Sequence, residues 1–341
     1  MAELKVGIIN VTGYAGVELA RLLYKHPRVK LVSVTGRSAA GQKLADVFPH
    51  LAEIDMTITA ELGEIDLAFS AMPHKSSAEV ILPLVERGIK VIDVSADFRL
   101  KDAGEYPKWY DFAHPAPKLL HKAVYGLPEI HRAEIAKASL VANPGCYPTG
   151  ALLALAPAVK EGLIHSDIII DSKSGVSGAG RTVSLSTHYT EAVDNVRAYS
   201  VHGHRHLPEI VQELGALAGL VPSVTFVPHL VPMSRGILSS CYATLKEGMS
   251  GKEGKLTDLY RNYYKGEPFV RVVEKPPETK QTWGSNLCLV YPTIDARSGK
   301  FIVVSCIDNL VKGAAGQAIQ NMNIMLGFSE TDGLEALPVY P

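Results

Sequence analysis

The residues around one cysteine are suited to making a reactive thiolate. Cys146 follows the Asn-Pro-Gly sequence of residues 143–145, which is typical of a turn, and precedes a run from Pro148 to about Pro157 that is apolar at helical spacing. At the start of a helix, unpaired backbone N–H groups and the positive end of the helix dipole stabilise a thiolate. A free cysteine is more often buried and inert, but this setting favours a nucleophile at Cys146.

A histidine-rich segment offers the acid/base group that such a nucleophile needs. Three of the 12 histidines fall within residues 202–206, and a proline shortly after them predicts that a helix begins there. We expect His206, beside that helix N-terminus, to exchange protons for Cys146, with His204 as the alternative. Arg205 between them is expected to bind substrate. A metal site is the other interpretation, but no cysteine or acid pair has ligand spacing, so no metal is predicted.

The chain begins with the pattern of a dinucleotide-binding unit. Residues 4–10 predict a strand, residues 11–16 a turn, and residues 17–24 a helix. Glycines in such a turn let the backbone approach a pyrophosphate at the helix N-terminus. We therefore expect Gly13 and Gly16 to bind a cofactor, although the glycine pattern alone also fits a purely structural turn.

The end of the second predicted strand, residues 30–35, indicates which dinucleotide is bound. This strand is followed by Gly36, Arg37 and Ser38. An NAD site usually carries an acidic residue at this place, whereas an arginine and a serine suit the 2′-phosphate of NADP. The sequence therefore predicts NADP, with Arg37 and Ser38 in its site, and the alternative is an exposed loop arginine.

The order of the remaining elements predicts two domains of different architecture. Before the cysteine, predicted strands alternate with helical stretches, which is typical of a Rossmann-type α/β domain with a doubly wound parallel sheet. The predicted segments here are strands 65–70, 90–95 and 138–142, a helix 77–87, and an irregular stretch 106–121.

After the cysteine helix, strands follow one another without regular intervening helices, which predicts an α+β domain with a mixed or antiparallel sheet. These strands are 167–172, 224–231, 236–245, 269–273, 286–291 and 300–307, and a helix 314–327 comes last. We assign residues 1–145 and 313–341 to an NADP-binding domain and residues 146–312 to a catalytic and dimerisation domain.

The composition argues against several classes of protein. The 341 residues are 47% hydrophobic and carry a net charge of −1, which gives no general attraction for nucleic acid or anionic membranes. No apolar run reaches the ~18 residues of a membrane span, and the N-terminus lacks a signal-peptide pattern. The four cysteines form no CxxC pair and imply no disulfide framework. We expect a cytoplasmic enzyme that acts on a small molecule.

Seven stretches spread over nearly the whole chain resemble a known family. The two most specific are Asn-Pro-Gly-Cys-Tyr-Pro-Thr-Gly around Cys146 and His-Arg-His-Leu-Pro-Glu-Ile at 204–210. The others are residues 13–19, 95–100, 124–130, 174–181 and 308–313. Together they resemble the N-acetyl-γ-glutamyl-phosphate reductases of arginine biosynthesis, in the aspartate-semialdehyde dehydrogenase superfamily. Asn10 departs from the pattern, because this family commonly has glycine there.

The resemblance implies the NADPH-dependent reduction of an acyl phosphate to N-acetylglutamate semialdehyde and inorganic phosphate. It implies a thioacyl intermediate on Cys146, proton transfer by His206, and phosphate binding by Arg99. It also suggests that Ser177, Gly178 and Gly313 contact the cofactor. A homodimer or homotetramer is expected.

Three other functions fit parts of the pattern. The lysine-pathway homologue performs the same chemistry on an acetylated or carrier-linked aminoadipyl phosphate, whose side chain is one methylene longer. Aspartate-semialdehyde dehydrogenase is a weaker rival, because its catalytic segment differs from residues 204–210. A dinucleotide-binding sensor without catalysis has no need of a helix-terminal cysteine and a histidine together.

Overall fold

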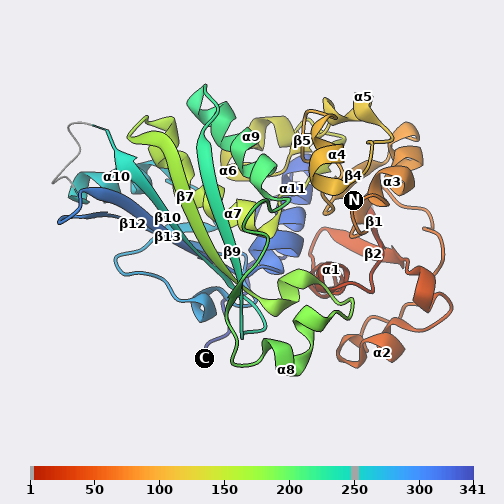
Figure 1. The fold of residues 1–341 in the computed structure, drawn as a ribbon. Helices are drawn as coiled ribbons and strands as arrows, with labels where there is room; N and C mark the ends of the chain where they lie inside the picture. The colour runs from red at the N-terminus through yellow and green to blue at the C-terminus, as the bar shows by residue number, and fades with distance from the viewer. Residues whose placement is uncertain (1–3, 247–252) are drawn as a thin grey trace. The chain divides into compact units, whose positions relative to one another are not determined.

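The computed structural model describes residues 4–246 and 253–341 (Figure 1). These residues divide into two compact units. The first comprises residues up to Gly145 together with Ala314–Ala336, and the second comprises Cys146–Gly313 together with Leu337–Pro341. Each unit is built around one β-sheet, so both are described separately below.

The first unit contains a six-stranded, fully parallel sheet in the order β2-β1-β3-β4-β6-β5. Its strands are β1 (Leu4–Ile9), β2 (Val29–Val34), β3 (Leu67–Ser70), β4 (Lys90–Asp93), β5 (Val124–Tyr125) and β6 (Leu140–Ala142). Strand β3 is buried at every residue, as expected for a parallel sheet covered on both faces. The order reverses beside β1, and the crevice at such a reversal is where open α/β sheets bind ligands. The doubly wound parallel sheet predicted from the sequence is confirmed.

The helices that the structure describes in the first unit are α1 (Tyr14–Leu23), α2 (Leu44–Val47), α3 (Ser77–Glu86), α4 (Glu105–Tyr110), α5 (Pro117–Leu120), α6 (Pro128–Ile135) and α11 (Gly316–Leu326). The sequence predicted a helix at α1, α3 and α11, whereas α2, α4, α5 and α6 were not predicted. The prediction that residues 106–121 are irregular was wrong, because α4 and α5 lie there. The Tyr106 ring, fully buried, packs against the rings of Tyr110, Phe112 and His114, so aromatic burial stabilises this short helix despite its proline.

The second unit contains a seven-stranded mixed sheet in the order β11-β12-β13-β10-β7-β9-β8. Its strands are β7 (Ile164–Gly175), β8 (Arg197–Ala198), β9 (Ser223–Val231), β10 (Ile237–Leu245), β11 (Val270–Val272), β12 (Cys288–Asp295) and β13 (Lys300–Ile307). Its helices are α7 (Cys146–Lys160), α8 (Tyr189–Ala192), α9 (Leu207–Ala218) and α10 (Glu253–Tyr263). The predicted mixed sheet is confirmed, whereas the regular helix α10 between two strands was missed.

Helix α7 is the central helix of the second unit and runs further than predicted. It begins at Cys146 itself and continues through Pro157 to Lys160. Pro157 has no N–H for the carbonyl of Leu153, and the Tyr264 hydroxyl donates to that carbonyl instead. The next carbonyl, of Ala154, accepts from Tyr260 at 2.7 Å. Two tyrosines from α10 and the residues just after it therefore satisfy the turn that the proline opens.

The C-terminal residues differ from the predicted domain division. Residues 313–341 were assigned to the cofactor domain, but Gly313 and Leu337–Pro341 group with the second unit. The tail is held there because the N–H of Val339 donates to the carbonyl of Trp283 at 2.9 Å. In the part of the chain that the structure describes, no helix is long and apolar enough to cross a membrane.

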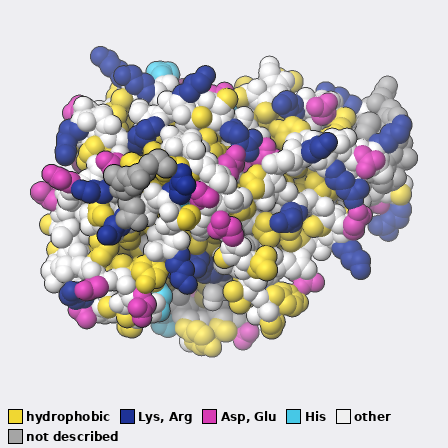
Figure 2. Space-filling view, turned by 180° about the vertical axis from the view of Figure 1, so that it is seen from behind, with side chains coloured by type: hydrophobic (Ala, Val, Ile, Leu, Met, Phe, Trp, Pro, Cys, Tyr) yellow, Lys and Arg dark blue, Asp and Glu magenta, His cyan; other side chains and the backbone are white. Residues whose placement is uncertain are grey.

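The surface carries charges of both signs. On the face drawn in Figure 2, lysine and arginine side chains are interspersed with aspartate and glutamate. This mixture agrees with the net charge of −1. A face of this kind gives no directed electrostatic attraction for a polyanion.

Candidate active site

Cys146 is the first residue of helix α7 and differs from the other cysteines in its exposure. It is partly exposed, whereas Cys241, Cys288 and Cys306 are buried. Burial raises the pKa of Cys306 to about 12, so this thiol stays protonated. Cys146 is therefore the cysteine of this chain that combines access with a helix N-terminus, the setting that favours a reactive thiolate.

Gly313 lies directly against the cysteine. A Cβ added to Gly313 would stand 2.8 Å from the Cβ of Cys146 and 3.3 Å from its Cα. No side chain fits at that distance, so the contact requires glycine. The resemblance suggested a cofactor role for Gly313, and the structure gives it this further role of close approach to Cys146. It belongs to a short π-helix, Val311–Ala315, a local distortion that is frequent at functional sites.

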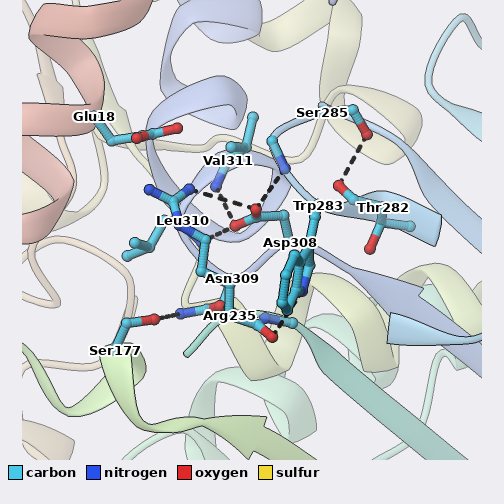
Figure 3. A network of polar contacts seen from close by, with 12 residues as sticks. Glu18, Ser177, Arg235, Thr282, Trp283, Ser285, Asp308, Asn309, Leu310 and Val311 are labelled. Carbon is cyan, nitrogen blue, oxygen red and sulfur yellow. Dashed lines mark hydrogen bonds and ion pairs between the residues drawn. The ribbon is translucent and has the colours of Figure 1, made fainter. Parts of the chain in front are cut away.

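The buried carboxylate of Asp308 holds the chain that delivers Gly313 (Figure 3). Its Oδ1 accepts the N–H groups of Leu310 and Val311 at 2.8 and 3.2 Å, and its Oδ2 accepts the N–H of Gly284 at 2.8 Å. Arg235 donates to the same Oδ2 at 3.4 Å. Asp308 therefore caps the π-helix and fixes the start of the segment that places Gly313 in contact with the cysteine.

Ser177 and Gly178 belong to the same corner of the second unit. The Ser177 hydroxyl accepts a hydrogen bond from Asn309 Nδ2 at 2.9 Å, as Figure 3 shows. A Cβ on Gly178 would stand 3.0 Å from the Ser174 hydroxyl. Ser177 therefore ties the glycine-rich turn after β7 to the segment that begins at Asp308, and Gly178 packs closely against the end of β7. Their predicted contact with the cofactor stays a prediction.

Tyr147, next to the cysteine, joins the predicted histidines in one aromatic cluster. Its ring centroid lies 5.7 Å from that of His204 and 5.9 Å from that of His206. The two histidine rings are 4.8 Å apart. The Tyr147 hydroxyl donates to the carbonyl of His229 at 3.0 Å and accepts from the Tyr199 hydroxyl at 3.2 Å. The histidine segment and the first turn of α7 thus meet through a tyrosine that the sequence analysis did not single out. Proton exchange between His206 and Cys146 stays a prediction.

The two histidines differ in their surroundings. His204 Nδ1 accepts the backbone N–H of His206 at 3.1 Å, which places the ring proton on Nε2. Burial, helped by the charge of Arg205, lowers the pKa of His204 to about 4. A group with this pKa is neutral near pH 7 and makes a poor proton donor there. His206 lies at the N-cap of α9 and is the better candidate for acid/base work.

Asn143, in the turn that precedes the cysteine, is fully buried, and each of its polar atoms forms a hydrogen bond. Its N–H donates to the carbonyl of Asp93 at 2.8 Å, and its side-chain Nδ2 donates to the carbonyl of Ala314 at 3.0 Å. Its Oδ1 accepts from Asn321 Nδ2 at 3.0 Å. Its carbonyl accepts from the Arg99 Nε at 2.8 Å. The turn is therefore fixed within the first unit by contacts from β4, α11 and Arg99.

Arg99 is buried, which qualifies its predicted role in phosphate binding. Its side chain is 6% exposed, and Nη2 donates to the carbonyl of Val94 at 2.9 Å in addition to the bond with Asn143. The guanidinium therefore holds the turn before the cysteine. Its contact with a substrate phosphate stays a prediction.

Two buried carboxylates lie near this arginine in the chain, Asp97 in the Ser95–Arg99 stretch and Asp93 at the end of β4. Asp97 accepts the N–H groups of Ser77 and Ala78 at 3.1 and 3.0 Å and so caps helix α3. Asp93 accepts hydroxyl hydrogen bonds from Ser77 and Ser95 at 2.6 and 2.7 Å. Desolvation, with a smaller contribution from Asp97, raises the pKa of Asp93 to about 6. The stretch that the sequence singled out therefore has a clear structural role.

The glycine turn after β1 fits a dinucleotide. Asn10 has a left-handed backbone with φ of 64°, which asparagine tolerates better than most residues. Its Nδ2 donates to the carbonyl of Ala71 at 2.9 Å, across the point where the strand order reverses. A Cβ on Gly16 would lie 2.5 Å from the Asn10 carbonyl oxygen, whereas one on Gly13 would meet nothing closer than 3.8 Å. Gly16 therefore permits close packing of α1 on the turn after β1, and Gly13 leaves an open place beside the helix N-terminus.

The residues predicted to read the 2′-phosphate are exposed. Arg37 and Ser38 lie in a short 3₁₀ turn, Arg37–Ala39, directly after β2. Among the described residues Arg37 has no hydrogen bond or ion pair, so its guanidinium is available to an anion. Arg205 is also exposed, at the start of α9, and its predicted contact with substrate stays a prediction.

Several residues of this site were missed from the sequence. Asp308 and Asn309 lie in a stretch that was used for the resemblance only, and Asn143 was considered only as part of a turn. Asn321 on α11 gave no signal, because its partner Asn143 is 178 residues away in the chain. For the contact between Gly313 and the cysteine, the sequence offered one local signal, namely that Gly313 directly follows a lysine.

Two family models together match most of the chain. A family model described as the semialdehyde dehydrogenase NAD-binding domain matches residues 5–138, and one described as the semialdehyde dehydrogenase dimerisation domain matches residues 146–309. A protein of Dehalococcoides mccartyi strain CBDB1 named N-acetyl-gamma-glutamyl-phosphate reductase is 60% identical over the full length of both chains. One of the same name from Heliobacterium modesticaldum is 49% identical, over 99% of this chain and all of that one.

Solved structures of similar fold are more distant in sequence. An aspartate semialdehyde dehydrogenase from Candida albicans, determined with NADP, gives a TM-score of 0.72 at 17% identity and covers 95% of this chain and 99% of that one. One from Vibrio cholerae gives 0.71 at 17% identity and covers 96% and 99%. These likenesses establish the fold of the chain.

Proposed function

The chain belongs to the N-acetyl-γ-glutamyl-phosphate reductases of the semialdehyde dehydrogenase family, and we propose that it uses NADPH and a thioacyl intermediate on Cys146. Its activity is the reduction of N-acetyl-γ-glutamyl phosphate in arginine biosynthesis, an oxidoreductase reaction. The observation that carries the proposed mechanism is the partly exposed Cys146 at the first residue of α7, while the other three thiols are buried. These four free cysteines support a place in the reducing cytoplasm.

The first step of the proposed mechanism is acyl transfer to sulfur. The thiolate of Cys146 attacks the acyl carbon, the bond from that carbon to the phosphate oxygen breaks, and inorganic phosphate leaves. Backbone N–H groups in the first turn of α7 stabilise the negative charge that develops on the carbonyl oxygen. A thioester then links the acyl group to Cys146.

The second step returns the aldehyde. When NADPH is bound, a hydride from its nicotinamide ring would reduce the thioester carbon. His206 gives a proton to the oxygen as the hemithioacetal forms and takes it back when the carbon–sulfur bond breaks. The aldehyde leaves and the thiolate of Cys146 is restored. Gly313, pressed against Cys146, limits the directions in which the sulfur side chain can turn.

The residues of the first unit fit an NADP cofactor. Gly13 leaves open space at the N-terminus of α1, where a pyrophosphate would bind backbone N–H groups. Arg37 and Ser38 would hold the 2′-phosphate that distinguishes NADP from NAD. The exposed guanidinium at Arg37 supports the choice of NADP.

A phosphate-dependent assay in the reverse direction tests the proposed function. N-acetylglutamate semialdehyde, NADP and inorganic phosphate should yield NADPH, and NAD should replace NADP poorly. The aminoadipate homologue and aspartate semialdehyde serve as parallel substrates under the same conditions. Faster turnover of either one would contradict the assigned substrate. Equal rates with NAD would contradict the cofactor.

We further propose that two copies of the chain pair through the open face of the second sheet. Helices α7, α9 and α10 pack against one another or against its strands. Ile169 on β7 and Tyr242 on β10 are cross-strand partners that remain 45% and 36% exposed. An exposed apolar pair in mid-sheet indicates a covered surface. Ile169→Lys should shift the sedimenting species toward monomer, and Val221→Lys, at an exposed loop, should not. An unchanged oligomer in the Ile169 variant would contradict this interface.

A further inference from the structure

Helix α11 carries four amide side chains that are fully buried: Gln317, Gln320, Asn321 and Asn323. Three of them have protein partners. Gln320 Nε2 donates to Glu330 at 3.0 Å, and Asn323 Nδ2 donates to the carbonyls of Glu330 and Asp332 at 3.2 and 3.0 Å. Asn321 Nδ2 donates to the carbonyl of Gly126 and to Asn143 at 2.8 and 3.0 Å.

Gln317 is the exception among the four. Within residues 4–246 and 253–341, neither its Nε2 nor its Oε1 has a hydrogen-bond partner. A buried primary amide without partners is costly, because both the donor and the acceptor have given up water. The neighbouring amides show that this helix otherwise satisfies its polar groups. The side chain of Gln317 therefore calls for a partner from outside the protein.

The position of Gln317 on the helix shows which way it faces. It lies one turn before Asn321, and residues four apart share a helix face. Ala314, three residues earlier on that face, is partly exposed, and its carbonyl accepts the side chain of Asn143. Side chains on a helix lean toward its N-terminus, so the amide of Gln317 leans toward Ala314. Gln317 thus lies in the first unit, on the helix face that contacts Asn143.

We propose that Gln317 forms hydrogen bonds with the carboxamide of the nicotinamide ring in bound NADPH. This inference rests on the cofactor assigned under the proposed function. A ligand group that satisfies Gln317 must offer one acceptor and one donor, and a primary carboxamide offers both. Gln317 belongs to the unit that contains the glycine turn, although neither family model includes α11. The amide therefore orients the ring, while the glycine turn and Arg37 hold the phosphates.

Binding titrations with three nucleotides test this role without turnover. The probes are NADPH, its 3-acetylpyridine analogue, which lacks the carboxamide N–H donor, and 2′-phospho-ADP-ribose, which lacks the ring. The wild-type chain should bind NADPH about 10-fold more tightly than the acetylpyridine analogue, the scale of one buried hydrogen bond. Gln317→Met should weaken NADPH about 10-fold and abolish this discrimination. Binding of 2′-phospho-ADP-ribose should not change.

Gln320→Met is the matched control, because it removes a buried amide one turn away whose partner is Glu330. It should leave the discrimination between NADPH and its analogue intact. Wild-type protein that binds both nucleotides equally would overturn the inference without any variant. So would a Gln317→Met variant that keeps the discrimination, or one that raises only the KM for the acyl substrate. Wild-type protein that binds neither NADPH nor 2′-phospho-ADP-ribose would instead overturn the cofactor assignment itself.

Discussion

Two strand-to-helix turns in this chain differ in how closely the surrounding residues hold them. The turn after β1 contains Asn10 and leads into α1, and the turn after β6 contains Asn143 and leads into α7. In the first, Gly13 has free space around it and the adjacent Arg37 is exposed. In the second, four hydrogen bonds hold Asn143 and the guanidinium of Arg99 is buried beneath it. One turn leaves its backbone open, and the other is fixed in place.

The difference agrees with the roles that we propose for the two turns. A phosphate is bound by several backbone N–H groups, so its turn needs open space. A nucleophile acts through one atom, and a small misplacement of that atom costs much of the rate, so its turn needs rigid support. An asparagine occurs in both turns, with a different role in each. At Asn10 it supplies a left-handed backbone, and at Asn143 it supplies a side chain that bonds in two directions.

The largest expected effect on folding comes from Gly16, with Gly13 as its matched control. Gly16→Ala places a methyl group 2.5 Å from a backbone oxygen, so we expect a loss of about 3 kcal/mol in the free energy of unfolding. Gly13→Ala meets no atom within 3.8 Å and should leave stability within about 1 kcal/mol while weakening NADPH binding. Denaturant unfolding and nucleotide titration measure both. Equal destabilisation by the two substitutions would contradict the conclusion that Gly13 has free space around it.

The next effect separates the two histidines beside the fixed turn. His206→Asn keeps much of the size of the side chain but removes the titrating group, and turnover should fall ~10²-fold. His204→Asn should cost less, because burial already holds the imidazole of His204 neutral, with a pKa of about 4. Steady-state kinetics at saturating NADPH compares the two variants. A larger loss for His204→Asn would exchange their assignments, and no loss in either would remove histidine from the mechanism.

The same low pKa predicts a dependence of stability on pH. The pKa of His204 is about 4 in the folded chain and 6.5 in an ordinary histidine, so the unfolded chain takes up this proton first. The contribution of His204 to stability is complete above pH 6.5 and is lost as the pH falls toward 4. His204→Asn should therefore reduce the loss of unfolding free energy between pH 8 and pH 5 by about 2 kcal/mol. Parallel pH profiles in the two proteins would contradict this buried, neutral state.

The smallest effect concerns cofactor choice at the open turn. Arg37→Ala should weaken NADP binding about 10-fold and leave NAD binding nearly unchanged, because only NADP carries the 2′-phosphate. Titration with both nucleotides measures the ratio of the two dissociation constants. If both affinities fell equally, Arg37 would support the loop and would not read the phosphate.

The sequence predicted local features well and distant partnerships poorly. The strand, turn and helix at each of the two turns follow from residue types within a short window, as does the placement of Cys146 at a helix start. Pro157 did not end α7, because Tyr264 supplies a hydrogen bond that no local pattern shows. The clamp on Asn143 uses residues 44 and 178 positions away. Such contacts follow from the fold, so a single sequence does not show them.

The most direct test of the account is a single-turnover measurement on the nucleophile. Mixing the enzyme with N-acetylglutamate semialdehyde and NADP without phosphate should release about one NADPH per chain in a burst, because the thioacyl enzyme then lacks its acceptor. Mass spectrometry should find the acyl group on the peptide that contains Cys146. Cys146→Ser should give neither the burst nor the adduct while still binding NADPH. A full burst in that variant, or an acyl group on another residue, would contradict the proposed mechanism.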